Sequence, residues 1–164
     1  MKYLYTSCVL LVAATVQSAE HPSWETLSKL LGKAADSPEV AGFVSAHKLD
    51  EITKGPSGAF SSPDQAYTLL YRKGQISSIV VRVAPRRKES SEPHWRAYSG
   101  KLPGGLSVDD GKDKVTAKLG KPVESRMNTW RQGDVHIWVH FNQAENGIDE
   151  LFISPRVIEA REQD

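Results

Sequence analysis

The chain has 164 residues, and its 21 Lys and Arg against 20 Asp and Glu leave almost no net charge. Without a charge excess, it lacks the general electrostatic attraction that draws proteins to nucleic acid or to anionic membranes. Cys8 is its one cysteine, which excludes an internal disulfide framework.

The N-terminal segment 1–19 predicts a cleaved export signal. Lys2 supplies a positive end, and Cys8–Ala14 is an apolar stretch too short to span a bilayer. Cleavage after Ser18 or Ala19 fits a signal peptidase site and leaves a chain without cysteine and with a formal net charge of zero. The alternative is a short N-terminal anchor or a buried helix. We expect a periplasmic or secreted protein without stable membrane insertion.

Two helices are predicted at the start of the remaining chain. Ser23 is a candidate N-cap for the first, in which apolar residues recur at helical spacing up to Gly32. Ser37 is a candidate N-cap for the second, because Pro38 suits the first helical position and Glu39 complements the positive end of a helix. The side chains expected to face inward are Trp24, Leu27, Leu30 and Leu31 in the first helix, and Val40, Phe43, Val44 and His47 in the second.

Three strands are predicted to follow, over 59–61, 67–71 and 75–83. The last two alternate apolar and polar residues on either side of Lys73-Gly74, which is typical of a hairpin with a tight turn. Segment 86–93 is polar, of mixed charge and bounded by proline, and we interpret it as a surface loop.

The same order of elements returns in the second half of the chain. Ser107 and Asp110 form a pair similar to a capping box, at the start of a helix that Gly120 ends. Strands are expected over 128–131, 135–142 and 148–154, with a hairpin turn between the last two. The tail 156–164 is polar and is expected to fray.

Segments 37–85 and 107–155 therefore look like one structural unit written twice, at a constant offset of 70. The prediction is an α+β fold, in which two tandem units of a helix and an antiparallel hairpin form one sheet with helices on one face. Both units belong to a single domain, 20–155. The offset matches Ser37 with Ser107, Phe60 with Trp130, Leu69 with Val139, Tyr71 with Phe141, Val81 with Leu151, Val83 with Ile153 and Pro85 with Pro155.

The run Ser107–Pro122, which ends in Leu-Gly-Lys-Pro, resembles the helix and Leu-Gly-x-Pro element of the β-lactamase-inhibitor-protein-like fold. Small outer-membrane assembly lipoproteins share this element. The following Trp130, long strand, turn and closing strand are similar too, although this chain lacks a lipid-attachment cysteine after its signal. The resemblance implies a tandem α+β fold with one sheet face open to bind a protein.

The sequence gives little indication of a catalytic or metal site. His136 and His140 share a strand face and could form half of a metal site, but no cluster supplies further ligands, so we favour ordinary sheet histidines. The serines lack a Gly-x-Ser-x-Gly elbow, and the glycines of 100–105 lack the end of a phosphate loop. We predict a protein that is not an enzyme and uses no metal or cofactor.

A surface on the sheet is the stronger prediction. If Leu69, Tyr71, Val139 and Phe141 lie beneath helices, the strand period of two places a second set of side chains on the opposite face. Aromatic and arginine side chains together are typical of a binding hot spot. The predicted partner-binding residues are Trp138, Phe152, His136, His140, Arg72 and Arg82, and the same face would also carry Leu70, Val80, Ile148 and Glu150.

The sequence thus predicts an exported envelope protein that binds and inhibits a protein partner. An immunity protein that neutralises a periplasm-acting toxin or cell-wall hydrolase fits best. A non-enzymatic accessory of outer-envelope assembly is the first alternative, and a small enzyme or metal-binding protein using His136 and His140 is the second. Segment 86–93 is a second candidate for the binding surface, and a loop, a helix or a second copy of the chain could also cover the open face.

Overall fold

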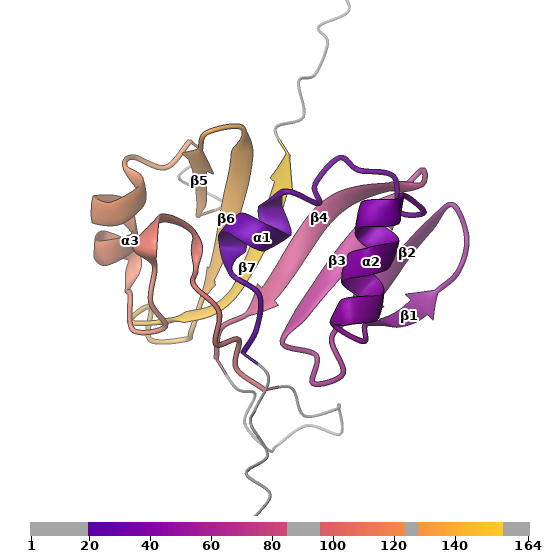
Figure 1. Ribbon diagram of the computed structural model, residues 1–164. Coiled ribbons are helices and arrows are strands. Elements are labelled where there is room, and N and C mark those ends of the chain that lie inside the picture. The colour runs from indigo at the N-terminus through magenta and orange to yellow at the C-terminus, as the bar shows by residue number, and fades with distance from the viewer. Residues whose placement is uncertain (1–19, 85–95, 124–127, 156–164) are drawn as a thin grey trace, which may run out of the picture.

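The computed structural model of the protein describes residues 20–84, 96–123 and 128–155, and has an α+β fold (Figure 1). The predicted segments 1–19, 86–93 and 156–164 lie outside the described residues. The helices are α1 (Trp24–Ser28), α2 (Pro38–Ala46) and α3 (Lys112–Leu119), with a 3-10 turn, η1 (Pro103–Gly105). The strands are β1 (Asp50–Thr53), β2 (Ser57–Ser61), β3 (Tyr67–Arg72), β4 (Gln75–Arg82), β5 (Thr129–Gln132), β6 (Val135–Phe141) and β7 (Ile148–Pro155).

All seven strands form one antiparallel sheet in the order β1-β2-β3-β4-β7-β6-β5. The hairpins β3–β4 and β6–β7 meet along β4 and β7, so β2-β3-β4 is followed by its counterparts in reverse order, β7-β6-β5, and β1 is an additional edge strand. Both hairpins carry a bulge at the same place, between Leu70 and Tyr71 in one and between His140 and Phe141 in the other. A bulge shared at this offset supports two copies of one structural unit.

The offset between the two units is not constant. It holds for β3 and β6, but Leu69 pairs with Ile79, whereas the equivalent Val139 pairs with Leu151. The return strand of the second unit is therefore displaced by two residues, because the turn between β6 and β7 is longer than the Lys73-Gly74 turn. The predicted matches of Val81 with Leu151, Val83 with Ile153 and Phe60 with Trp130 are each wrong by two residues.

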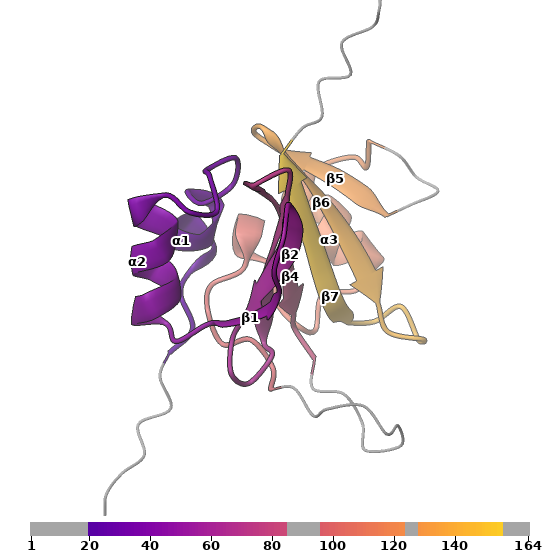
Figure 2. The same cartoon turned by 90° about the vertical axis from the view of Figure 1, so that its right-hand side faces the viewer.

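One face of the sheet packs against the helices and forms the core. Tyr71 and Phe141 are both buried there, as the repeat predicts, and Trp130 is fully buried. In Figure 2, α1 and α2 lie to one side of β1, β2 and β4, while α3 lies behind β6 and β7. Helical side chains complete this core, namely Trp24, Leu27, Val40 and Val115, with Phe43, Val44 and Leu119 packed at its margin.

The predicted helix caps are confirmed in part. The Ser37 side chain accepts a hydrogen bond from Val40 N at 3.4 Å, and Pro38 opens α2 as expected. The first helix ends at Ser28 instead of near Gly32, because the following backbone turns away to bond with β4. Gly32 N donates to Ile76 O, and Ile76 N donates to Lys33 O.

The second unit's helix begins later than predicted. Asp110 is buried and its carboxylate accepts from Ser107 N at 2.7 Å, which is half of a capping box. That contact closes a turn, and α3 starts only after Gly111. Gly120 ends the helix with a φ of 86°, as predicted.

Two further features differ from the sequence prediction. Strand β1 was not predicted, since all four of its residues are exposed and it has no alternating pattern. Ile148 was assigned to the open face but is buried in the core, because the bulge beside it turns its side chain over. In the described part of the chain, no helix is long and apolar enough to cross a membrane.

Candidate functional site on the open sheet face

The sheet face opposite the core carries no described helix (Figure 2). One row of side chains crosses this face from strand to strand, because each member is the direct register partner of the next. The row reads Asp50, Ser61, Thr68, Val80, Phe152, Trp138 and Thr129. We call this surface the open face.

Trp138 is the most prominent side chain of the open face. It is 48% exposed, whereas its strand neighbours Ile137 and Val139 are fully buried on the other side. Phe152 lies opposite on β7, and the two rings meet edge to face with centroids 6.2 Å apart. Such a pair holds both rings in place, so an exposed indole is presented from a rigid strand.

The predicted Arg82 lies beside this aromatic pair. It is the register partner of Glu150, and Arg82 Nε is 3.7 Å from Glu150 Oε2. Arg82 Nη1 also donates to Gln65 O at 2.7 Å and to Thr68 Oγ1 at 3.3 Å. These contacts fix the guanidinium at the border of the patch.

The two predicted histidines flank Trp138 on β6. His140 is exposed and is the register partner of Glu150, while His136 is half-buried and pairs with Arg131 on β5. Among the residues that the structure describes, no group of three or more potential ligands could hold a metal ion. The pair therefore gains no further ligand from the fold.

Arg72 does not join the other predicted residues. It is exposed at the turn end of β3, where it pairs with Gln75 and Ser57. Thr68, the β3 member of the row through Trp138, is four residues away along the strand, about 13 Å at 3.3 Å per residue. Trp138, Phe152, His136, His140 and Arg82 thus form one patch, and Arg72 lies outside it.

A second polar cluster was not predicted from the sequence. His21 bridges two distant loops: its Nε2 lies 2.8 Å from Asp64 Oδ2, and its Nδ1 accepts from Ser99 N at 2.9 Å. The ring stacks on Tyr98 at 5.3 Å, and the Tyr98 hydroxyl donates to Pro22 O. No local pattern could reveal these contacts, which join residues 43 and 78 positions apart.

The Asp64 carboxylate is held for this bridge by its own neighbours. Ser62 Oγ donates to Asp64 Oδ1 at 2.8 Å, and Ala66 N donates to the same oxygen at 3.2 Å. Burial raises the pKa of Asp64, but the hydrogen bonds from Ser62 and His21 outweigh it and leave the pKa below its usual value. The carboxylate thus stays ionised opposite His21.

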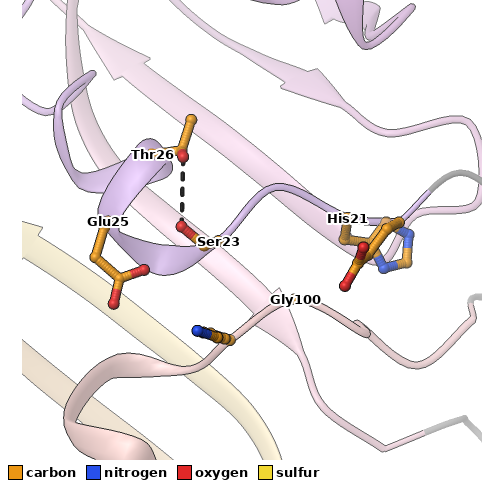
Figure 3. Close-up of a pocket in the computed structure, with 7 residues that line it drawn as sticks. His21, Ser23, Glu25, Thr26 and Gly100 are labelled. Carbon is orange, nitrogen blue, oxygen red and sulfur yellow. Dashed lines mark hydrogen bonds between the residues drawn. The ribbon is translucent and has the colours of Figure 1, made fainter.

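A hollow of about 410 Å³ lies beside this cluster (Figure 3). His21 points to one end of it, and Ser23 and Thr26, which are joined by a 3.3 Å hydrogen bond, lie near the other. The Ser23 hydrogen bond lowers the pKa of Glu25, which keeps this carboxylate ionised near Lys101. The lining residues are Glu20, His21, Ser23, Glu25, Thr26, Gly100 and Lys101.

Ser99, His21 and Asp64 together have the composition of a hydrolytic triad, since Ser99 Oγ lies 3.0 Å from His21 Nδ1. The detailed geometry opposes that role. Ser99 N already donates to the same nitrogen, which occupies the lone pair that a general base needs. The cluster is better explained as an anchor that ties the N-terminal segment to the sheet domain.

Comparisons with known proteins identify the fold and no more. No family model matches the chain, and no curated protein matches it significantly. The fold is similar to a solved structure of a cysteine-rich secretory protein from Staphylococcus aureus subsp. aureus Mu50, with a TM-score of 0.54 and 11% sequence identity. That similarity covers 84% of this chain and 49% of the other, so this chain spans about half the length of its structural neighbour. The resemblance to β-lactamase-inhibitor-protein-like proteins stays a prediction.

Proposed function

We propose that this chain is an exported protein that binds another protein through the patch around Trp138 and inhibits it. The partner would be a toxin or a cell-wall hydrolase acting in the periplasm, and the chain would then serve as an immunity protein. The observation that carries the proposal is the half-exposed Trp138, held against Phe152 on the face opposite the helices.

The patch has the features of an interface anchor. Tryptophan and arginine are enriched among the residues that carry most of the binding energy in protein complexes. Trp138 and Arg82 project from adjacent parts of one continuous sheet, so the surface they form needs little ordering when a partner binds. A rigid surface of this kind can block a partner by covering its active site.

Export is supported by the signal-like pattern of 1–19. The structural neighbour is described as a secretory protein, which agrees with export and says nothing of inhibition. The competing proposal is an accessory of outer-envelope assembly, which the Leu-Gly-Lys-Pro resemblance favours. The two differ in what deletion of the gene should cause: sensitivity to a specific toxin, or a general loss of envelope integrity.

Capture from an envelope extract tests the binding proposal. The exported protein is compared with Trp138→Ala and with Ile52→Ala, which removes an exposed apolar side chain on β1, at the opposite edge of the sheet. We expect one protein to be captured by wild type and Ile52→Ala, and at least tenfold less of it by Trp138→Ala, as for an anchor residue worth about 2 kcal/mol or more. The enzymatic or toxic activity of the captured protein should fall when the wild-type chain is added.

Equal capture by all three baits would place the partner elsewhere, with 86–93 as the next segment to test. Trp138-dependent capture of an envelope-assembly component, with no toxin or hydrolase among the captured proteins, would instead favour the accessory role.

A further inference from the structure

The first structural unit shows which residue lies at the position equivalent to Trp138. Thr68 and Trp138 occupy equivalent positions on β3 and β6, two residues before Leu70 and His140, where the shared bulge begins. Their partners Val80 and Phe152 face each other across the centre of the sheet. Thr68 is only 6% exposed, against 48% for Trp138. The first unit therefore has a small, buried polar residue at this position, whereas the second unit presents a half-exposed indole that is packed against Phe152.

The neighbours of Trp138 on β6 are more polar than their equivalents in the first unit. His140 stands where the first unit has Leu70, and His136 stands where it has the buried Ala66. Arg131 lies next to His136 on the outer strand β5. Two imidazoles thus replace apolar side chains beside the aromatic pair, and an arginine lies next to one of them.

The carboxylate beside the patch already has a basic partner. Glu150 is the one carboxylate of the patch among the described residues, and Arg82 lies 3.7 Å from it. Arg131 is exposed, donates from Nε to Gly133 O at 3.1 Å, and has no ion pair within the described ranges. The positive charge of Arg131 therefore lies at the β5 edge of the patch, next to His136, without an ion-pair partner among the described residues.

We propose that the patch recognises an acidic protein surface, one in which carboxylates border an apolar recess that accepts the Trp138 ring. This inference rests on the proposed function and specifies the chemistry of its partner. A recess would complete the burial of the indole, and carboxylates would pair with Arg131 and accept hydrogen bonds from the His136 or His140 ring. Nucleic acid fits less well, because its binding draws on many phosphate contacts and the patch offers few fixed cations.

Titration of the isotope-labelled exported protein by NMR tests the charge preference without an identified partner. The probes are poly-L-glutamate as an acidic polypeptide, poly-L-lysine as its opposite and heparin as an anionic glycan. We expect poly-L-glutamate to shift the Trp138 indole N–H and the amides around it, and this effect to weaken between about 20 mM and 300 mM salt. Poly-L-lysine should leave these signals unchanged.

Charge reversal identifies the residue responsible. Arg131→Glu should weaken poly-L-glutamate binding between about two- and thirtyfold, since one exposed ion pair worth about 0.2–1 kcal/mol becomes a repulsion of similar size. Lys29→Glu makes the same reversal at an exposed position beside α1 and should bind as wild type. Lys29→Glu is the matched control, because it makes the same charge change away from the patch. The remaining amide signals report whether each variant keeps the fold.

Each other outcome overturns the proposal. Absence of poly-L-glutamate shifts at Trp138, or larger shifts with poly-L-lysine, would show that the patch does not prefer acidic polypeptide. Tighter binding of heparin would assign it to a glycan, and shifts that depend on protein concentration alone would assign it to a second copy of the chain. Trp138-dependent capture of a basic partner would overturn this inference while leaving the proposed function intact.

Discussion

Val80 and Phe152 face each other across the β4–β7 pairing and occupy equivalent positions in the two halves of the sheet. A pseudo-two-fold axis therefore passes between them. Along the row that leads away from this axis, the first half continues to Thr68 and the second half to Trp138. The first half thus has small, buried side chains along this row, and the second half presents a half-exposed tryptophan.

The first prediction concerns the duplicated core. Phe141→Ala should lower the free energy of unfolding by about 3–5 kcal/mol, because it removes a large buried ring whose equivalent, Tyr71, is also buried. Urea denaturation measures the change. Tyr71→Phe is the milder comparison, since it keeps the ring and removes only the hydroxyl bonded to Thr53 O at 2.8 Å. A loss below about 1 kcal/mol for Phe141→Ala would contradict the assignment of Phe141 to the core.

The second prediction concerns the N-terminal anchor. His21→Ala removes hydrogen bonds to Asp64 and Ser99 and a ring stacked on Tyr98. From about 0.5–1.5 kcal/mol for each hydrogen bond and a similar amount for the ring pair, we expect a loss of about 2–4 kcal/mol in unfolding free energy. His140→Ala, at an exposed histidine, should stay within about 0.5 kcal/mol of wild type. Equal effects of the two substitutions would show that the bridge does not stabilise the domain.

The sequence predicts the fold well where local chemistry determines it. Ser37-Pro38 places the start of α2, and the alternation in 67–71 and 135–142 places the core face correctly. Strand β1 could not be predicted in this way, because all of its side chains are exposed. It joins the sheet through backbone pairing with β2 and through hydrogen bonds from the Tyr71 hydroxyl to Glu51 Oε1 and Thr53 O.

The candidate site is harder to predict, because small shifts in register decide it. The bulge that buries Ile148 leaves no trace in the residue pattern, and a two-residue displacement of β7 makes Phe152 the equivalent of Val80. The alternation of side chains along a strand nevertheless predicts correctly that Trp138 lies on the open face. A displacement of β7 by two residues leaves each side chain on the same face of the sheet. Arg72 shares that face but lies too far along β3 to join the patch.

A third prediction follows from the pKa of His47. Burial, and then the charge of His21, lower this pKa in the folded protein. The unfolded chain binds the proton more readily, so His47 leaves stability unaffected above about pH 6.5 and reduces it as the pH falls from there towards the lowered folded value. His47→Gln should therefore lose less stability than wild type between about pH 7.5 and pH 5, measured by urea denaturation. A wild-type slope that the substitution leaves unchanged would contradict the shift.

A fourth prediction separates the two arginines of the predicted site. Arg82→Ala should weaken partner capture, and it should also lower stability by about 1–3 kcal/mol, because it leaves Gln65 O without its donor and Glu150 without its ion-pair partner. Arg72→Ala should change partner capture by less than about twofold, because Arg72 lies outside the patch, and stability by at most about 0.5 kcal/mol. Parallel binding and thermal unfolding measurements on both variants test this, and a larger binding loss for Arg72 would extend the interface across the whole sheet.

The last prediction compares two tryptophans on neighbouring strands. Trp138→Thr copies the residue that the first unit has at the equivalent position, so the sheet should accept it. We expect it to cost at most about 1.5 kcal/mol in unfolding free energy, which is the upper value for losing the aromatic pair with Phe152.

Trp130→Ala gives the opposite expectation, because Trp130 is fully buried and its Nε1 donates to Gly120 O at 3.1 Å. That change should cost about 3–5 kcal/mol. Urea denaturation of both variants, together with capture of the envelope partner by Trp138→Thr, completes the test. If Trp138→Thr unfolds the domain, the indole belongs to the structure and the open face loses its anchor; if it folds and its capture falls at least about tenfold, the exposed ring serves binding.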